Sequence, residues 1–338
     1  MNATIRDVAR EAQVSVATVS RALNGHGNVA DPVRTRVFEA AARLRYSPHA
    51  AARSLSSRRT HTLGVVLPDV HGEFFSELVR GIDQVIRQHG LHLLVSSSHG
   101  HPDEQAAALR AMRGRVDGLV VMAPFAGIDV PTMLASSIGS GLPAVLLGAD
   151  AEPDGVASLR IDNRGGAATM TAHLAARGFR RIAFLAGPEG NLDAAERLQG
   201  FRDALARIAP AHTPMVIAGD FDEASGHAAG QAIASMAERP DAVFAANDMM
   251  ALGCVFALTQ AGLRVPDDVA VAGFDDIPLA RYVHPGLTTM RVDIAELGAR
   301  AARRLVAALA GRAAPPADDD SPIQPALIER ESTRRGGP

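Results

Sequence analysis

The stretch Tyr46-Ser-Pro-His-Ala-Ala-Ala-Arg-Ser-Leu55 joins two unlike halves of this 338-residue chain. Ser47 is a favourable N-cap, and Pro48 would take the first helical position, where its missing N–H costs nothing. The helix favoured by the alanines that follow would span only about two turns, and isolated helices shorter than roughly 12 residues are marginal in water. We therefore expect this segment to become helical only when another surface holds it. By itself the stretch is more typical of an ordinary linker, so its interpretation depends on the sequence on either side.

The first part of the chain is basic, whereas the remainder is acidic. Residues 1–60 contain ten Arg against four Asp or Glu, a formal charge of +6, although the whole chain carries −3. A basic module of this kind favours contact with a polyanion, because binding to phosphates releases their counterions. The chain contains no Lys, so Arg or uncharged donors would have to make these contacts.

Three short helices are expected in the first 46 residues. Thr4 can cap a helix at residues 5–12, and Ser15 can cap a second helix at residues 16–24. A third helix, opened by an Asp-Pro pair, should cover residues 31–44. Three helices around one small core, two of them joined by a tight turn, are typical of a helix-turn-helix module.

The second of these helices has an outward face suited to DNA. Val16, Ala17 and Arg21 would project together from its first turn and a half. An Arg can bond the O6/N7 edge of guanine, and small apolar side chains can touch a thymine methyl. Hydroxyl and amide side chains nearby suit contact with the DNA backbone: Thr4, Ser15, Thr18, Ser20 and Asn24. A surface helix with one solvated Arg fits a bare helix-turn-helix pattern about equally well.

Three runs resemble the LacI/GalR family of bacterial repressors: residues 4–12, 14–24 and 46–55. The resemblance implies a DNA-binding headpiece followed by a hinge helix, with Val16, Ala17 and Arg21 at the base-reading positions. It implies that Leu55 enters the central minor-groove step of the operator, with Arg53 supplying positive charge beside it. It also implies a homodimer on a pseudo-palindromic, double-stranded DNA operator. The Val-Ala pair is similar to that of the galactose-repressor branch.

From residue 61 onward, apolar runs alternate with amphipathic stretches, which is typical of parallel sheets with helices on both faces. The first set predicts strands at residues 63–67, 91–96, 118–122 and 144–147, with helices at residues 74–89, 103–113 and 131–140. The second set predicts strands at residues 181–186, 214–217, 242–246 and 269–272, with helices at residues 165–177, 194–208, 223–236 and 249–261. Two such sets predict two lobes, with a ligand cleft at the carboxyl ends of their strands.

The resemblance covers nearly the whole chain and implies a body like that of periplasmic sugar-binding proteins. The expected fold is therefore α/β: a helix-turn-helix headpiece at residues 1–46, a hinge helix and linker at residues 47–60, and an effector-binding and dimerisation domain with two parallel sheets at residues 61–338. By the resemblance, lobe 1 takes about residues 61–161 and 292–320, and lobe 2 takes about residues 162–291 and 321–332. A strand at residues 323–328 would return the chain to lobe 2.

Strand ends and family motifs together give a set of candidate effector-binding residues: Phe75, Asp193, Arg197, Phe221, Asn247 and Asp275. Their charged and amide groups suit neighbouring hydroxyls, with the two Phe as apolar walls, so a sugar is expected. For Asp248 and Asp276, a helix cap or a salt bridge is about as favoured as ligand contact. Gly148 and Ala149 replace an Asp-Arg pair of many relatives, so one ligand-contacting charge is either missing or moved to Asp150.

Other functions have less support. No apolar run reaches the roughly 18 residues of a membrane span, and no signal-peptide pattern begins the chain. The single Cys254 excludes an intrachain disulfide framework. A cytoplasmic protein without membrane contact is therefore expected. A solute-binding protein of a transporter would need an export signal and no basic headpiece. An enzyme would need an activated nucleophile or an acid–base pair, and no nucleotide, acyl-transfer or metalloprotease motif is present. His99 and His101 fit solvated loop residues better than a zinc site.

We therefore predict a transcriptional regulator, not an enzyme, with no cofactor and no metal. It would act as a repressor whose operator binding is controlled by a small-molecule effector, most favourably a sugar. A purine- or nucleoside-responsive regulator is the alternative, because the purine repressor shares this body, although Asn191 and Asp193 depart from its pattern.

Overall fold

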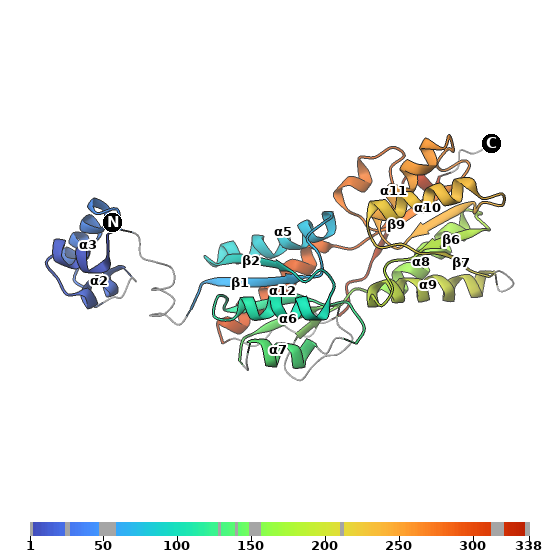
Figure 1. Cartoon of the computed structure of the whole chain (residues 1–338). Helices are drawn as coiled ribbons and strands as arrows, with labels where there is room; N and C mark the ends of the chain where they lie inside the picture. Colours follow the sequence, from blue (N-terminus) through green and yellow to red (C-terminus); the bar gives the residue numbers. More distant parts are fainter. Residues whose placement is uncertain are drawn as a thin grey trace. The chain divides into compact units, whose positions relative to one another are not determined.

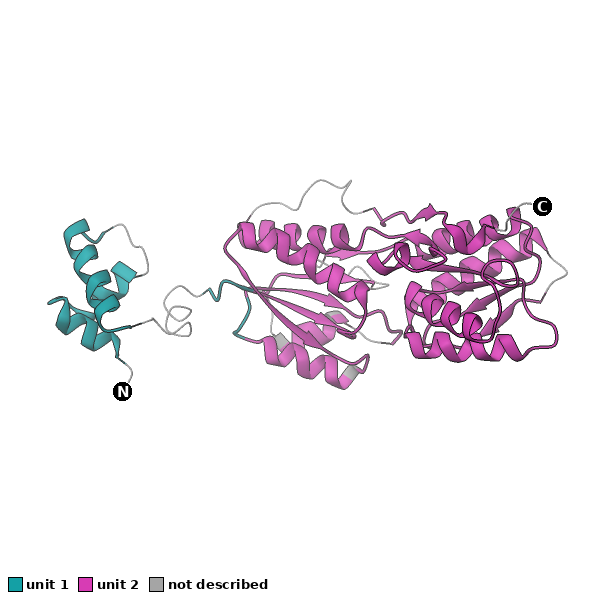
Figure 2. Ribbon diagram, turned by 90° about the horizontal axis from the view of Figure 1, so that it is seen from above, with its two compact units in different colours: residues 1–62, 114–116 teal, residues 63–113, 117–338 magenta. Residues whose placement is uncertain are grey.

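The computed structural model (Figure 1) describes residues 3–23, 28–46, 59–127, 130–138, 141–148, 157–209, 213–311 and 321–334. The chain divides into two compact units (Figure 2). The small unit holds residues 1–62 with 114–116, and the body holds residues 63–113 and 117–338.

Three helices form the small unit, as predicted: α1 (Ile5–Glu11), α2 (Val16–Leu23) and α3 (Asp31–Arg43). Val8, Val19 and Val37 are fully buried between them and belong to a core of their own. Thr4 caps α1, since its backbone N–H and its hydroxyl both donate to Asp7 Oδ2, at 2.9 and 2.7 Å. The core uses one face of each helix, which leaves the opposite face of α2 open to solvent.

Lobe 1 of the body is built on a five-stranded sheet in the order β2-β1-β3-β4-β5. β1, β3, β4 and β5 run parallel, and β1 and β3 are buried along almost their whole length because helices cover both faces of the sheet (Figure 2). The strands are β1 (Thr62–Leu67), β2 (His92–Ser97), β3 (Gly118–Met122), β4 (Ala144–Leu147) and β5 (Ala157–Leu159). The helices between the first four strands are α5 (Glu73–Gln88), α6 (Pro102–Met112) and α7 (Val130–Ile138).

Lobe 2 is built on a six-stranded sheet in the order β11-β10-β9-β8-β6-β7, parallel except for the antiparallel edge strand β11. The strands are β6 (Ile182–Leu185), β7 (Met215–Ile217), β8 (Ala242–Ala245), β9 (Ala270–Asp275), β10 (Thr288–Arg291) and β11 (Ala326–Ile328). The helices are α8 (Asn163–Ala176), α9 (Leu192–Ile208), α10 (Glu223–Ser235) and α11 (Asp248–Gln260), and the short 3₁₀ turns are η1 (Pro278–Arg281) and η3 (Glu331–Thr333).

The expected α/β fold with two sheets is confirmed, and every helix and strand predicted within the described residues is present, with its ends within three residues of the predicted ones. The hinge helix predicted after residue 46 lies outside the described residues and remains a prediction. Three elements were not predicted: β5, β10 and the helix α12 (Ile294–Leu309). α12 packs against α5, β3 and β4, so the chain returns to the sheet of lobe 1 after β10. The exact lobe limits remain predictions. None of the described helices combines the length and the apolar character that a membrane crossing requires.

Two glycines allow α5 and α12 to touch backbone to backbone. A Cβ at Gly81 would lie 1.9 Å from the carbonyl oxygen of Ala295, and a Cβ at Gly298 would lie 2.3 Å from that of Leu78. Both separations are far below van der Waals contact, so the helices have to move apart if either glycine gains a side chain. This contact holds α12 on lobe 1.

We therefore expect Gly81→Ala to destabilise the body by about 1–3 kcal/mol, the usual cost of overpacking a well-packed core. The free energy of unfolding in urea would measure this loss. Gln84→Ala is the matched control, because Gln84 lies exposed on the same helix and its replacement should change stability by less than about 0.5 kcal/mol. Equal stabilities of the two variants would contradict the close approach of α5 and α12.

Candidate functional site

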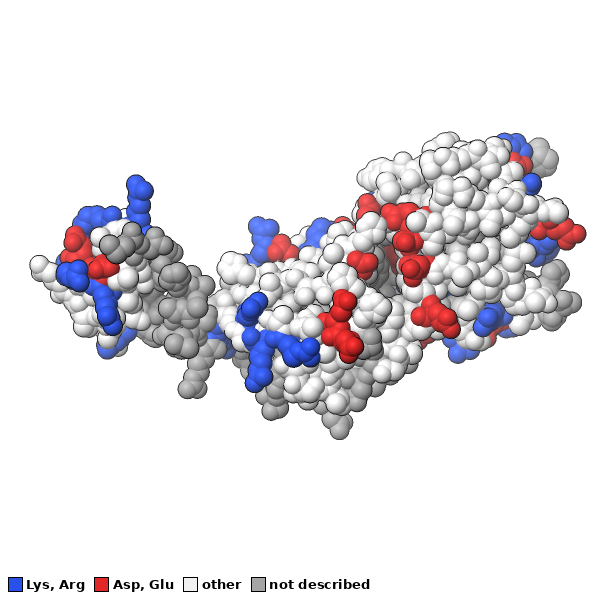
Figure 3. Space-filling model, in the orientation of Figure 1, with Lys and Arg blue, Asp and Glu red and all other residues white. Residues whose placement is uncertain are grey.

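The exposed face of α2 carries the predicted base-reading residues. Val16, Ala17 and Arg21 are exposed, whereas Val19 and Ala22 are fully buried in the core of the small unit. In Figure 3, arginine side chains are visible on the surface of this unit. The structure therefore leaves these three side chains free to contact another molecule.

The polar residues predicted for the DNA backbone have varied surroundings. Ser15 caps α2, because its Oγ accepts the backbone N–H of Thr18 at 3.1 Å and lies 2.9 Å from the Thr18 hydroxyl. Thr4 is similarly occupied in the cap of α1. Ser20 is partly exposed on α2. The remaining predicted DNA contacts lie outside the described residues: Asn24, Arg53 and Leu55.

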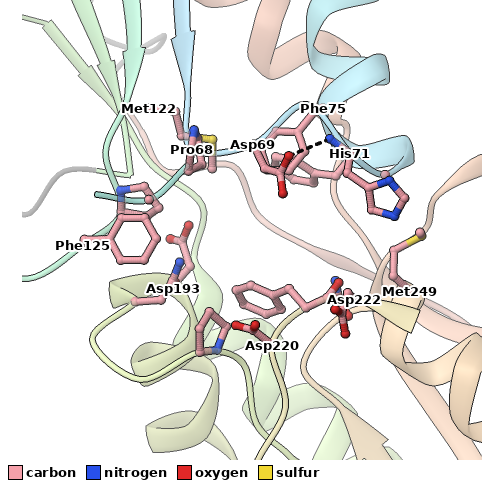
Figure 4. Close-up of a pocket in the computed structure, with 18 of the residues that line it drawn as sticks. Pro68, Asp69, His71, Phe75, Met122, Phe125, Asp193, Asp220, Asp222 and Met249 are labelled. Atoms are coloured by element: carbon pink, nitrogen blue, oxygen red, sulfur yellow. Dashed lines mark hydrogen bonds between the residues drawn. The ribbon is translucent and has the colours of Figure 1, made fainter. Parts of the chain in front are cut away.

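A cavity of about 710 Å³ lies between the two lobes of the body, with walls from both (Figure 4). Lobe 1 contributes residues that follow β1, β2 and β3, and lobe 2 contributes residues that follow β6, β7, β8 and β9. Parallel strands of one sheet end at the same edge, which is why segments far apart in sequence meet here. All six candidate effector-binding residues line this cavity: Phe75, Asp193, Arg197, Phe221, Asn247 and Asp275.

Arg197 is held in the cavity wall by a network of polar and aromatic contacts. Its Nε donates to Asn163 Oδ1 at 2.8 Å, and a terminal nitrogen donates to the carbonyl oxygen of Ala246 at 2.6 Å. The same nitrogen lies 3.3 Å from Asp275 Oδ1, in an ion pair whose side chains are each only 5% exposed. The guanidinium carbon lies 4.0 Å from the ring centroid of Phe274 and 5.8 Å from that of Phe221.

Asp275 is a strained carboxyl group whose pKa lies near neutral pH. Its φ is 115°, in the left-handed region that non-glycine residues rarely adopt. Burial raises the pKa of Asp275 to about 7; Arg197 opposes this rise, and the nearby carboxylate of Asp193 adds to it. Asp193 is in turn hydrogen-bonded to the Nδ2 of Asn163 at 2.8 Å. Asn163 thus links Arg197 to Asp193.

Asn247 shapes the cavity by positioning its neighbours. Its Oδ1 accepts the backbone N–H of Met250 at 3.0 Å and caps α11, and its Nδ2 donates to the carbonyl oxygen of Phe221 at 2.8 Å. Phe221 has a φ of 65°, so this bond secures an unusual backbone conformation that turns the ring toward the cavity. Asn247 therefore combines the helix cap with a place in the cavity wall.

Asp248 and Asp276 have structural surroundings and do not line the cavity. Asp248 is fully buried, where it accepts the Thr289 hydroxyl at 2.6 Å and the Ile277 N–H at 3.0 Å. Burial, reinforced by Asp275, raises the pKa of Asp248 well above its ordinary value. Asp276 accepts from Arg291 and Arg330, at 2.7 and 2.6 Å. The salt-bridge alternative therefore describes Asp276 better than ligand contact does.

Several cavity residues were not predicted from the sequence: Asp69, His71, Phe125, Asp220, Asp222 and Met249. Asp69, Phe125 and Asp220 follow β1, β3 and β7 within three residues, so the strand-end rule was a usable signal for them. His99 and His101 are exposed loop residues, as predicted, and they also line the cavity. Within the described residues, no group of three His, Cys, Asp or Glu could hold a metal ion.

Gly148 stands where many relatives were expected to carry a charged residue. A Cβ at this position would lie 3.5 Å from Asp193 Oδ2. The carboxylate of Asp193 therefore occupies the region that a side chain at position 148 would approach. Ala149 and Asp150 lie outside the described residues.

Backbone contacts join the two lobes at one end of the cavity. The N–H of Leu192 donates to the carbonyl oxygen of Pro124 at 2.6 Å, and the N–H of Ala126 donates to that of Gly190 at 2.9 Å. Phe125, which lies at this end in Figure 4, forms an antiparallel bridge with Asn191.

Side chains join the lobes at the other end, where Figure 4 places His71. The N–H of Leu279 donates to the carboxylate of Glu73 at 2.8 Å, and His71 Nε2 lies 3.2 Å from Glu223 Oε2. With contacts at both ends, the angle between the lobes is set by interactions that border the cavity.

Comparison with known proteins relates both units to established models. A model described as bacterial regulatory proteins of the lacI family matches residues 4–49, and a model described as a periplasmic binding protein-like domain matches residues 171–333. The chain is 36% identical to the HTH-type transcriptional regulator GalR of Salmonella typhimurium over 334 residues, which cover 98% of this chain and 96% of GalR.

Solved structures extend the similarity to the fold. A lac repressor dimer bound to operator and the anti-inducer ONPF matches with a TM-score of 0.84 and 29% identity, over 98% of this chain and 99% of that one. A complex of the transcriptional regulator CelR with cellobiose matches with a TM-score of 0.68 and 32% identity, over 98% and 99% of the two chains.

The raised pKa of Asp275 predicts a specific pH dependence of stability. An unfolded Asp loses its proton near pH 3.9, whereas folded Asp275 keeps its proton up to about pH 7. Its contribution to stability is therefore fully present below about pH 4 and is lost as the pH rises through 7. Between about pH 5 and pH 8, the free energy of unfolding in urea should fall more for the wild type than for Asp275→Asn. Asp275→Asn also removes the charge that raises the pKa of Asp248, which lowers the pH slope of the variant further. Equal pH slopes would show that Asp275 is already ionised at pH 5.

Proposed function

The chain belongs to the lacI family of bacterial regulatory proteins and is a DNA-binding transcriptional regulator, and we propose that its effector binds in the cavity between the lobes. One observation supports this most directly. Six residues chosen from sequence positions between 75 and 275 line the same cavity. Unrelated surface residues would not converge in this way.

We expect the effector to be a sugar. Carboxylates, an amide and a guanidinium around one cavity suit a ligand with many neighbouring hydroxyls, and the Phe75 and Phe221 rings suit the apolar face of a sugar ring. The cavity volume of about 710 Å³ lies within the usual range of small-molecule sites. The similar CelR structure is a complex with cellobiose. A nucleoside remains the second candidate, because Phe75, Phe125 and Phe221 offer aromatic faces against which a base could stack.

We expect operator binding by a homodimer, as in the lac repressor structure, with two copies of α2 in successive major grooves about 10 base pairs apart. Val16, Ala17 and Arg21 would contact base edges, and the hydroxyl-bearing residues of the small unit would contact the DNA backbone. Leu55 and Arg53 would act in the minor groove, an expectation that rests on the sequence alone. A cytoplasmic location follows from this role, and no catalytic turnover of the effector is expected.

Effector and operator would be coupled through the lobes. A ligand that favours one lobe angle shifts the contacts at the two ends of the cavity, such as the bond between Glu73 and Leu279. In a dimer, that angle sets the spacing of the two linkers at residues 47–60, and with it the free energy of binding to both half-sites. Each ligand must then change the affinity of the other by the same factor.

Asp193→Asn tests the effector site. Asparagine keeps the shape of the side chain and can still accept from Asn163, so the fold should be preserved. Loss of the charged acceptor should weaken effector binding by about 1.5–3 kcal/mol. Thermal-shift screening with a sugar and nucleoside panel, followed by calorimetry with the ligand found, would measure this.

Asp203→Asn is the control, because Asp203 pairs with Arg164 on the surface of α9 and outside the cavity wall. Equal affinities for the ligand in the two variants would refute the proposed effector site.

Arg21→Ala tests the DNA-reading face of α2. The substitution should relax base preference at one position of each half-site, at a cost of about 1–3 kcal/mol for the preferred base. Binding to a library of operators, each changed at one position, would measure the effect. Arg10→Ala removes the same charge from the exposed surface of α1, and should weaken binding to all operators to a similar, small extent. A uniform loss with Arg21→Ala as well would assign Arg21 to phosphate contact instead.

A further inference from the structure

The cavity wall carries six carboxyl side chains against one Arg and three His side chains. Arg197 is the only Arg or Lys among the described residues that line it. The carboxylates come from both lobes: Asp69 from lobe 1, and Glu189, Asp193, Asp220, Asp222 and Asp275 from lobe 2. Figure 4 shows Asp69 across the cavity from Asp193, Asp220 and Asp222. A ligand between the lobes is therefore surrounded by negative charge.

Arg197 does not balance this charge, because its guanidinium is already engaged. It bonds to Asn163 and to the carbonyl oxygen of Ala246, and it forms an ion pair with Asp275 at 3.3 Å. Both members of the pair are only 5% exposed, so Asp275 offsets much of the positive charge of Arg197 even though Arg197 lines the cavity. The pair neutralises Asp275 and leaves the other carboxylates without compensation from this residue.

Asp193 accepts from the Asn163 side chain at 2.8 Å, and the remaining carboxylates have backbone donors or no described cation. Asp69 accepts the N–H groups of Val70 and His71, and Asp222 accepts the N–H of Ser225 at the start of α10. These donors are neutral, so they orient the carboxylates and leave their charge in place. In the described part of the chain, neither these two residues nor Glu189 and Asp220 form an ion pair with an Arg or a His.

A second observation concerns Asp275, whose Oδ1 has only the ion pair with Arg197 at 3.3 Å among the described residues. Asp275 is 3% exposed, and its Oδ1 accepts no well-aligned hydrogen bond from any described residue. A buried carboxylate oxygen without a hydrogen bond is costly, and such oxygens are normally satisfied by protein, water or ligand. Because Asp275 lines the cavity, an N–H group of a ligand can reach this wall.

We infer that the effector of this protein is a cation, specifically a polyhydroxylated ligand that bears an ammonium group, as an amino sugar does. The inference rests on the proposed effector site and adds a charge to its ligand. An ammonium group offers three N–H donors and no acceptor, which matches a wall rich in carboxylate oxygens. The hydroxyls of the same ligand can use the remaining oxygens and the Asn247 amide. A phosphate or a carboxylate on the ligand would lie close to several like charges and be excluded.

The test compares ligands that differ in charge and little else. Glucosamine, galactosamine and mannosamine would be titrated into the full-length protein by calorimetry at about pH 7, where an ordinary His is mostly neutral. Each would be compared with its parent hexose, its N-acetyl derivative and its hexose 6-phosphate. We expect one amino sugar to bind at least roughly tenfold more tightly than its uncharged counterparts, with the difference reduced in about 0.5 M salt, and no binding of the phosphates.

Asp220→Asn isolates the contribution of one cavity charge. Asp220 is exposed to the cavity and its carboxylate has no described partner to lose, so the variant should fold. The preference for the amino sugar over its N-acetyl form should fall by roughly three- to tenfold. Asp267→Asn removes the same charge from the surface outside the cavity and should leave the preference unchanged.

The outcomes separate the two proposals. If a neutral sugar binds as tightly as its amino form, or if a sugar phosphate binds, the cationic effector is refuted and the sugar site stands. If a nucleoside binds and no sugar does, the sugar class and the cationic amino sugar are both refuted. If Asp220→Asn and Asp267→Asn change the preference equally, the cavity charge does not select the ligand.

Discussion

The cavity depends on the burial of one positive charge. Removing a guanidinium from water costs several kcal/mol unless it is fully paired, and Arg197 is paired by polar groups from three other segments. Asn163 begins α8, Arg197 lies on α9, the carbonyl of Ala246 follows β8, and Asp275 ends β9. The rings of Phe274 and Phe221 add apolar and cation–π contacts. A shift of any of these segments would leave buried charge unpaired, so this ion pair fixes the wall that lobe 2 contributes to the cavity.

Much of the fold could be predicted because its periodicity is clear. Runs such as Leu63–Leu67 and Gly118–Met122 are apolar throughout, as expected for strands buried on both faces, and glycines or charged caps separate them from the helices. The helix at Ile294–Leu309 has a comparable apolar stripe and was nevertheless not predicted. Its position on lobe 1 could not be derived from its own sequence, because it depends on a close approach that Gly81 and Gly298 permit only in three dimensions.

The candidate site was predictable where a residue type and a strand end coincide. Asn247 and Asp275 met both conditions, whereas Arg197 was identified from the family motif alone, and all three line the cavity. Asn163 was not identified, because it lies at the start of a helix where an Asn usually has only a local role, yet here it joins Arg197 to Asp193. Asp69 and Asp220 were missed for a related reason: the sequence does not tell whether a carboxylate beside a turn faces solvent, a backbone N–H or a cavity.

The contacts between Pro124 and Leu192 and between Ala126 and Gly190 use only backbone atoms. Substitution of the neighbouring side chains leaves these backbone hydrogen bonds intact, as long as the local backbone conformation is kept. Mutation of cavity side chains can therefore alter which compound is recognised without breaking the hydrogen bonds that join the two lobes. A scaffold with this separation can acquire new effectors during evolution while its response to them is preserved.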